Sequence, residues 1–329
     1  MATAASAAVS SSSSKLASNK MPQRPSPPSG MVERLDSSYL RGLARQYGLS
    51  RMGARPPFRQ YVRDVTKHRE FIEALGEGSA ESRNENNYLG QIWAVLNPTL
   101  NAIFYIVFFG LILRTGGSIG NSIAFIVIGQ FMWQFMKSAV TTGGKSVSGK
   151  IGIIRALHFP RAVLPIATVY ALFRSFLWSA LVMLFITVVS GLIPYYAIIM
   201  PTWTWLLLPL VFILMFFFAA GTAFITSRIV AITPDVSNVI SFLMRFGMFG
   251  SGVVFPITRY VHGSHFWTVV LTYQPFAVYI NLARQVIMHD PTLPITMSTW
   301  VMAIFWAALF FTVGFVFFWR GEERYGRDG

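Results

Sequence analysis

Between Glu85 and Glu322 the chain has only two acidic residues, Asp235 and Asp290, in a stretch rich in apolar residues. Soluble domains carry about 25% charged residues, whereas this chain carries 12%. A surface with so few charges is incompatible with water, so most of this stretch must face lipid. The absence of cysteine also excludes disulfides, thiolate metal sites and thiol nucleophiles.

Six apolar segments, each near the roughly 20 residues that a bilayer requires, predict an all-α, polytopic membrane protein with six transmembrane helices. Their approximate ranges are 98–114, 122–142, 162–191, 203–226, 238–255 and 296–319. The segment 256–294, between spans five and six, is too long for a turn and too apolar for a loop. We expect it to form re-entrant outer helices, which are tolerated where protein or water covers the backbone.

The remaining sequence predicts three flanking regions around a six-span membrane domain over 98–320. Residues 1–57 indicate a disordered basic tail, and 321–329 a short second tail. Residues 58–97 predict amphipathic helices with a polar hinge at 76–87, suited to the membrane interface or to packing on a partner. The apolar positions of the first helix are Phe58, Tyr61, Val62, Val65, Ile72 and Leu75.

The basic residues predict the orientation of the spans. About half of the Lys and Arg residues precede residue 84, and the loop 143–161 holds many of the others. If the N-terminus is inside, the outer segments contain only Arg114, Arg259 and Arg284. The positive-inside rule therefore places both termini in the cytoplasm. This asymmetry accounts for the net charge of +14, so we predict no nucleic-acid partner.

Three kinds of chemistry are poorly supported by the sequence. The Gly-Lys-Ser at 144–146 resembles the end of a phosphate-binding loop, but Ala139 replaces the required first glycine and an apolar span precedes it. Asp235 and Asp290 lie outside the predicted spans, which argues against coupling to an ion gradient. The histidines are dispersed, so we predict neither a metal nor a cofactor in this chain.

Aromatic and basic residues inside the spans predict a channel. A charge within the bilayer is costly and marks an aqueous path or a partner, unless it snorkels to the interface. Aromatic faces stack on the apolar faces of sugars, although in most membrane proteins they pack together or face lipid. The predicted lining comprises Tyr105, Phe108, Phe109, Arg174, Phe242, Arg245, Phe246 and Phe249.

Four segments, in order along the chain, resemble those of ABC-type polysaccharide export permeases. They are YLGQIWAVLNP at 88–98, IIRALHFPRAVLP at 153–165, PDVSNVISFLMRFGMFGSGVVFP at 234–256 and TYQPFAVYINLARQVI at 272–287. The Phe-Pro-Arg block at 159–161 is the most specific. Three features depart from the family pattern: Arg83 alone replaces a basic cluster before Leu-Gly, Ala162 replaces an acid, and Pro234 replaces the arginine before Asp235.

The resemblance implies a homodimeric, non-enzymatic transport subunit in the bacterial cytoplasmic membrane, driven by two ATPase subunits that bind ATP and Mg. The cargo would be a polyprenyl-diphosphate-linked glycan of the cell-wall galactan or O-antigen type. An ABC permease for a small hydrophobic substrate and a membrane-embedded glycosyltransferase are the alternatives. The implied substrate entrance is Asn86, Asn87, Tyr88, Leu89, Gly90 and Trp93. The implied ATPase-coupling residues are Lys150, Arg155, His158, Phe159, Pro160 and Arg161.

Overall fold

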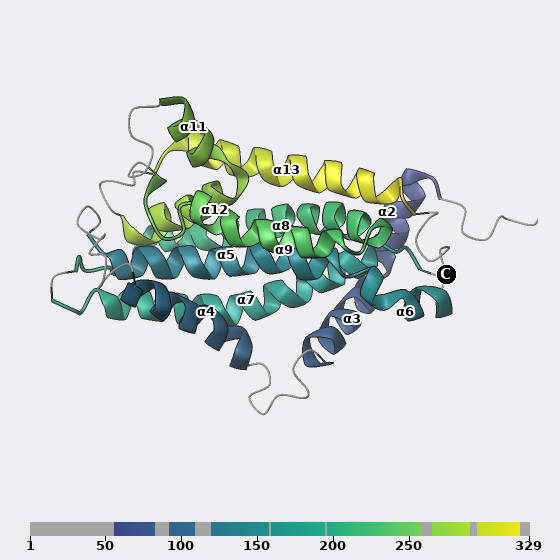
Figure 1. The fold of residues 1–329 in the computed structure, drawn as a ribbon, viewed down its shortest axis with the longest axis horizontal. Helices are drawn as coiled ribbons and strands as arrows, with labels where there is room; N and C mark the ends of the chain where they lie inside the picture. The colour runs from purple at the N-terminus through teal and green to yellow at the C-terminus, as the bar shows by residue number, and fades with distance from the viewer. Residues whose placement is uncertain are drawn as a thin grey trace, which may run out of the picture. The chain divides into compact units, whose positions relative to one another are not determined.

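The computed structural model is all-helical in the residues that it describes, as the sequence predicts (Figure 1). The described ranges are 56–82, 92–108, 120–157, 159–194, 196–257, 265–289 and 295–322. They belong to one compact unit over Arg55–Gly329. The predicted basic tail lies almost wholly outside the described residues, and so does the second tail beyond Glu322.

Four helices are long and apolar enough to cross a membrane, judged by length and composition. They are α5 (Ser122–Gly144), α7 (Val163–Ser190), α8 (Leu208–Ile232) continuing η4 (Trp203–Leu207), and α13 (Met297–Trp319). These helices correspond to predicted spans two, three, four and six. They are the features expected of a multi-pass membrane protein.

The helices at predicted spans one and five are shorter. α4 (Trp93–Tyr105) and α9 (Val236–Gly250) have 13 and 15 residues. They are therefore about 20 Å and 22 Å long, less than the roughly 30 Å of the hydrocarbon core. α4 also continues through Pro98, whereas the sequence predicted that the flanking helices of 58–97 end where the first span begins at residue 98. Six spans thus remain a prediction.

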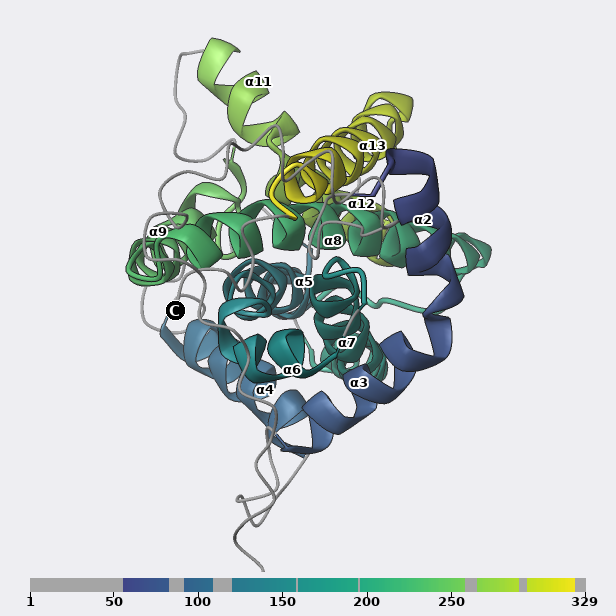
Figure 2. The ribbon, with the colours of Figure 1, turned by 90° about the vertical axis from the view of Figure 1, so that its right-hand side faces the viewer.

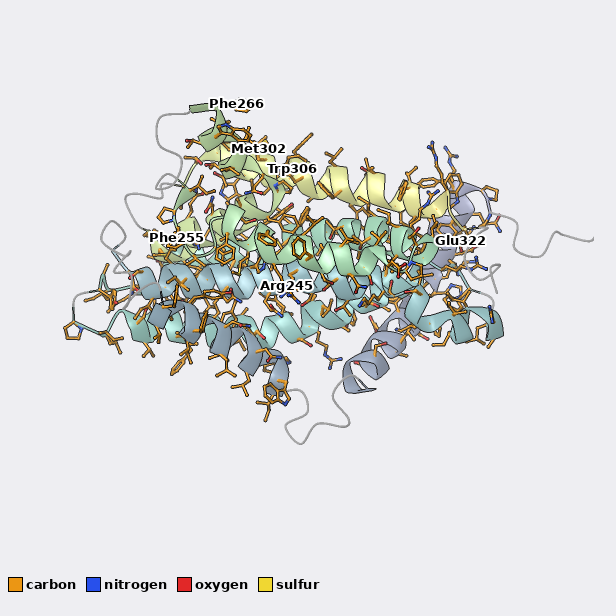
Figure 3. All side chains as sticks on the ribbon, viewed as in Figure 1. Arg245, Phe255, Phe266, Met302, Trp306 and Glu322 are labelled. Atoms are coloured by element: carbon orange, nitrogen blue, oxygen red, sulfur yellow. The ribbon has the colours of Figure 1, made fainter. Side chains whose placement is uncertain are left out.

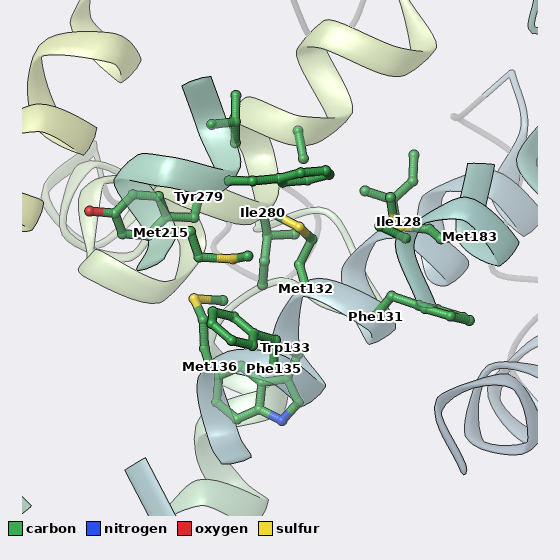
Figure 4. Packing of buried hydrophobic residues seen from close by; sticks show 14 of the residues in the cluster. Ile128, Phe131, Met132, Trp133, Phe135, Met136, Met183, Met215, Tyr279 and Ile280 are labelled. Carbon is green, nitrogen blue, oxygen red and sulfur yellow. The ribbon is translucent and has the colours of Figure 1, made fainter. Parts of the chain in front are cut away.

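α5 is the central helix of the bundle. It contacts α4, α7, α8, α9 and α12 (Pro275–Met288), and Figure 2 shows it surrounded by several of these helices. Most of its side chains are buried. Figure 4 shows Met132 and Met136 of α5 in one cluster with Met215 of α8 and Tyr279 of α12. A helix enclosed in this way needs apolar residues around its whole circumference, which is what the α5 sequence provides.

Arg284 ties α12 to α5 and to the turn after α9. Its guanidinium donates to the carbonyl oxygens of Phe125, Gly252 and Val253 at 2.9, 2.8 and 2.7 Å, and lies 3.3 Å from the centre of the Phe125 ring. Arg284 is only 1% exposed. A Cβ added to Gly129 would lie 2.4 Å from Nη2 of Arg284, so glycine is required there. The sequence had marked Arg284 only as an outer basic residue.

The described part of segment 256–294 forms two helices, α11 (His265–Tyr273) and α12. Gln274 separates them and donates from Nε2 to the carbonyl of Gly250 at 2.6 Å. α12 is buried along nearly its whole length. α12 is therefore part of the protein core, whereas Phe266 and Trp267 of α11 are exposed, and re-entry of the segment into the membrane stays a prediction.

The predicted amphipathic helix is present as α2 (Phe58–Lys67) and α3 (Arg69–Ser82). Tyr61 and Val65 are buried against the chain's own helices, whereas Phe58 and Val62 are exposed. Because α3 continues to Ser82, the predicted hinge does not begin at residue 76. A Cβ at Gly76 would lie 3.1 Å from the Ala167 carbonyl of α7, so α3 packs closely against α7 at this glycine.

α8 and α13 approach each other closely enough for their backbones to touch. A Cβ added to Gly221 would lie 2.3 Å from the Phe310 carbonyl carbon, and one added to Gly314 would lie 2.4 Å from the Gly221 oxygen. Real side chains do not tolerate such distances. The pair therefore uses small residues to bring two membrane helices into contact, as is common inside bilayers.

We predict that Gly221→Ala or Gly314→Ala lowers stability by about 1–3 kcal/mol, because each added methyl forces the two helices apart. The measurement is thermal unfolding of the purified protein in detergent. Gly250→Ala is the matched control, since a Cβ at Gly250 meets no atom within 4 Å. Equal melting temperatures for all three variants would contradict the close contact.

Candidate functional site

The connection between α5 and α7 forms an elbow at one end of the bundle. It consists of η3 (Ser148–Lys150), α6 (Ile151–Ala156) and the residues that lead into α7. Ile154 is buried and anchors α6 to the bundle, whereas Ile151, Arg155 and Leu157 are exposed. The exposed face of α6 therefore combines apolar side chains with a cation, a composition suited to a protein contact.

The elbow is fixed at its base by a group that we call the Glu322 network, formed by Tyr61, Arg161, Ala162 and Glu322. The buried Glu322 carboxylate accepts the Arg161 backbone N–H at 3.0 Å and the Tyr61 hydroxyl at 2.7 Å. That hydroxyl accepts the Ala162 N–H at 3.0 Å, and the Arg161 guanidinium donates to the Glu322 carbonyl. The network joins α2, the start of α7 and the end of α13, near the Glu322 label in Figure 3.

Further contacts hold the elbow against α3. Lys150 donates from Nζ to Ser79 Oγ at 2.6 Å, and the rings of Phe159 and Phe71 are 5.1 Å apart. Pro160 is half-buried, and its carbonyl accepts the Val163 N–H at 3.0 Å. These predicted coupling residues therefore position the loop.

Among the predicted coupling residues, Arg155 alone is described with an exposed side chain. Arg161 is half-buried in the Glu322 network, and His158 lies outside the described residues. Contact between any of these residues and an ATPase stays a prediction.

The Gly-Lys-Ser at 144–146 is the end of α5, where two glycines allow α8 to approach. A Cβ added to Gly143 would lie 2.7 Å from Ala223 Cβ, and one added to Gly144 would lie 3.2 Å from Thr226. A helix precedes this segment in place of the strand that a phosphate-binding loop requires. Helix packing thus explains these glycines without a nucleotide.

The predicted channel residues fall mainly on α9 and α4, two helices that both pack against α5 (Figure 2). On α9, the residues Phe242, Arg245, Phe246 and Phe249 are all exposed. Tyr105, the last residue of α4, is half-buried, and Phe108, just beyond α4, is exposed, while Phe109 lies outside the described residues. Arg174 is on α7, where it pairs with Glu77 of α3.

Most of the predicted substrate entrance lies outside the described residues, namely Asn86, Asn87, Tyr88, Leu89 and Gly90. Trp93 is the first residue of α4 and is half-buried. Within the described part of the chain, no three His, Asp or Glu side chains come together as a metal site would require.

Sequence reasoning missed the roles of Tyr61 and Glu322. The available signals were weak: Tyr61 occupies the apolar face of the predicted helix, and Glu322 is the first acid after the last span. Their partnership spans 261 positions, so no local pattern reveals it.

These features define a helical, multi-pass membrane protein with a fixed elbow at one end. No protein-family model matches the chain. It is 24% identical over 262 residues to the O-antigen export system permease protein RfbA of Myxococcus xanthus, covering 80% of this chain and 96% of that protein.

Two O-antigen export system permease proteins RfbA of Klebsiella pneumoniae are 29% and 28% identical to the chain over 224 residues. Each of these matches covers 67% of this chain and 81% of the relative. The resemblance to polysaccharide export permeases, predicted from four sequence segments, is therefore confirmed over most of the chain.

We predict that Tyr61→Phe destabilises the protein by about 1–3 kcal/mol, because it leaves the buried Ala162 N–H and one oxygen of Glu322 without their partner. Thermal unfolding in detergent measures the loss. Tyr170→Phe serves as a control, because Tyr170 is half-buried outside the network. A variant as stable as the parent would show that the hydroxyl is dispensable.

Burial raises the pKa of Glu322 above its ordinary value of 4.5, outweighing the donors that face the carboxylate. The folded protein thus binds this proton more tightly than the unfolded chain does. This tighter proton binding adds to the free energy of unfolding. The added stability is fully present below pH 4.5 and is lost as the pH rises through the raised pKa of Glu322.

We therefore expect the melting temperature of the parent, relative to that of Glu322→Gln, to fall as the pH rises from 4.5 towards neutrality. The two proteins would be compared across this range in the same detergent. A difference that stays constant with pH would show that Glu322 does not titrate differently on folding.

Proposed function

We propose that the chain is the membrane subunit of an ABC exporter that moves polyprenyl-diphosphate-linked polysaccharide across the bacterial cytoplasmic membrane. A separate ATPase, present in two copies, would bind ATP and Mg and supply the energy. The observation that carries the proposal is the exposed face of α6 on an otherwise fixed elbow, in a chain similar to O-antigen export permeases.

The contacts of the elbow would transmit a movement of such an ATPase to the helices of the bundle. Ile154 connects α6 to the apolar cluster that contains Leu164 of α7 and Phe318 of α13. The Glu322 network fastens the same helices to α2. A displacement of α6 would therefore move the ends of several helices together, because packed interiors shift as units rather than deform smoothly.

Charge favours the end of the bundle that carries α6 as the cytoplasmic side. Lys145, Lys150 and Arg155 lie in the elbow, and Arg320 follows α13 at the same end. An excess of cations is typical of cytoplasmic loops. This orientation places the exposed face of α6 where a cytoplasmic ATPase would reach it.

The exposed aromatic face of α9 supports a path for the glycan. Phe242 and Phe246 have ring centres 4.8 Å apart, and both are more than half exposed in the single chain. In a homodimer, this face and that of α4 would line the seam between two copies. Apolar ring surfaces allow a sugar chain to slide because they offer few directional bonds. The diphosphate would enter near Asn86–Gly90 and Trp93.

The names of the relatives favour an O-antigen type of glycan, and a cell-wall galactan has the same carrier chemistry. An ABC permease for a small hydrophobic substrate is the alternative. The two are separated by an export assay in a strain that lacks this chain. Restored surface glycan after its return, with the ATPase, supports the proposal, whereas unchanged glycan with altered drug efflux favours the alternative.

We predict that Leu157→Asp, which puts a charge directly after α6 and beside its exposed residues, abolishes ATP-dependent export and co-purification of the ATPase without changing the melting temperature. Leu157 is 52% exposed, so the aspartate costs the fold little. Leu192→Asp is the matched control, because Leu192 is 72% exposed in the turn after α7, at the opposite end. Normal export by Leu157→Asp would remove α6 as the docking element.

A further inference from the structure

Two cations lie close together along the seam where α9 packs against α5. Lys137 of α5 is half-buried, Arg245 of α9 is exposed, and they are near enough for their charges to repel each other. Such proximity is unfavourable in a medium of low dielectric constant unless an anion lies nearby.

The helix contact explains why these two residues meet. A Cβ added to Gly247 of α9 would lie 3.1 Å from the ring of Trp133, so the helices touch at this point. Lys137 follows Trp133 by one turn, and Arg245 precedes Gly247. Because α5 and α9 run in opposite directions, both cations lie on the α6 side of the contact.

The pair is set back from the end of the bundle. The helical rise places Lys137 about 10 Å from Gly144 and Arg245 about 14 Å from Val236. Figure 3 shows Arg245 well away from Glu322 at one end and Phe255 at the other. These cations therefore differ from the basic residues of the cytoplasmic loops, which lie beyond the helix ends.

The described part of the chain offers them no carboxylate. Its ion pairs join Arg69 to Glu73 and Arg174 to Glu77. Asp235, at the start of α9, is about 15 Å from Arg245 along the helix. Among the described residues, no carboxylate therefore pairs with Lys137 or Arg245.

We infer that Lys137 and Arg245 together bind the diphosphate of a lipid-linked glycan as it passes along the α5–α9 seam. The inference rests on the proposed function and adds a binding site to it. A diphosphate diester carries one negative charge on each phosphate, which matches two cations. A phospholipid phosphate diester carries a single charge and would leave one cation uncompensated.

The neighbouring side chains fit the remainder of such a ligand. Phe242 and Phe246 flank Arg245 on the exposed face of α9. Their rings provide an apolar surface for the prenyl chain or for the first sugar, while the guanidinium offers paired donors to phosphate oxygens and the ammonium acts as a compact charge. The single chain leaves Arg245 accessible to such a ligand.

The test is equilibrium binding of a synthetic polyprenyl diphosphate sugar to the full-length protein in nanodiscs of neutral phosphatidylcholine. Lys137→Gln and Arg245→Gln should each weaken binding about ten-fold, the usual effect of losing one charge-assisted contact. Lys137→Arg should retain affinity. Arg320→Gln removes an exposed charge outside the seam and should bind as the parent does.

Each outcome decides between distinct explanations. Unchanged affinity in both Gln variants would show that Lys137 and Arg245 do not bind the diphosphate, and would leave the proposed function intact. No binding by the parent protein would remove the diphosphate-linked substrate together with the site. If phosphatidylglycerol displaced the probe from the parent at equal concentration, the cations would form a headgroup site and the inference would fail. Thermal unfolding of each variant shows that it is folded.

Discussion

The arrangement of the helices depends on how buried carbonyl groups are satisfied where α9 ends inside the protein. An unpaired carbonyl in an apolar environment costs several kcal/mol, and lipid offers no donor to replace water. Arg284 donates to Gly252 and Val253 in the turn after α9 and to Phe125 of α5. One planar cation with five donors thus fixes three separate segments, a role that lysine cannot fill.

The opposite end of the bundle is fixed by a single carboxyl group, that of Glu322. Glu322 accepts from Tyr61 and from the Arg161 backbone, so the first and last described helices meet the elbow at one carboxylate. Between these two polar anchors the helices pack through apolar side chains and through glycines such as Gly221 and Gly314. Polar bonds are therefore concentrated where irregular backbone or a chain end needs a partner.

The cations of the α5–α9 seam differ from Arg284 in this respect. Arg284 is enclosed by carbonyl oxygens and the Phe125 ring, so its charge is stabilised by groups of the protein itself. Arg245 faces outwards and sits beside exposed aromatic rings. Arg174 differs from both, since it pairs with Glu77. Whether an arginine stabilises the fold or is a candidate to bind a ligand therefore depends on its burial and its bonding partners, because the residue type is the same.

The sequence by itself determined that the chain is helical and apolar enough for a membrane, because hydrophobic length and missing acids are local properties. It also located the elbow and the resemblance to export permeases, which rest on short contiguous motifs. It misjudged the break at Pro98 and the hinge at residue 76, where packing on α5 and α7 extends helices that local signals would end. Only the tertiary structure decided the roles of Arg284, Tyr61 and Glu322. Their partners are backbone atoms or distant residues, and such contacts leave no periodic trace in the sequence.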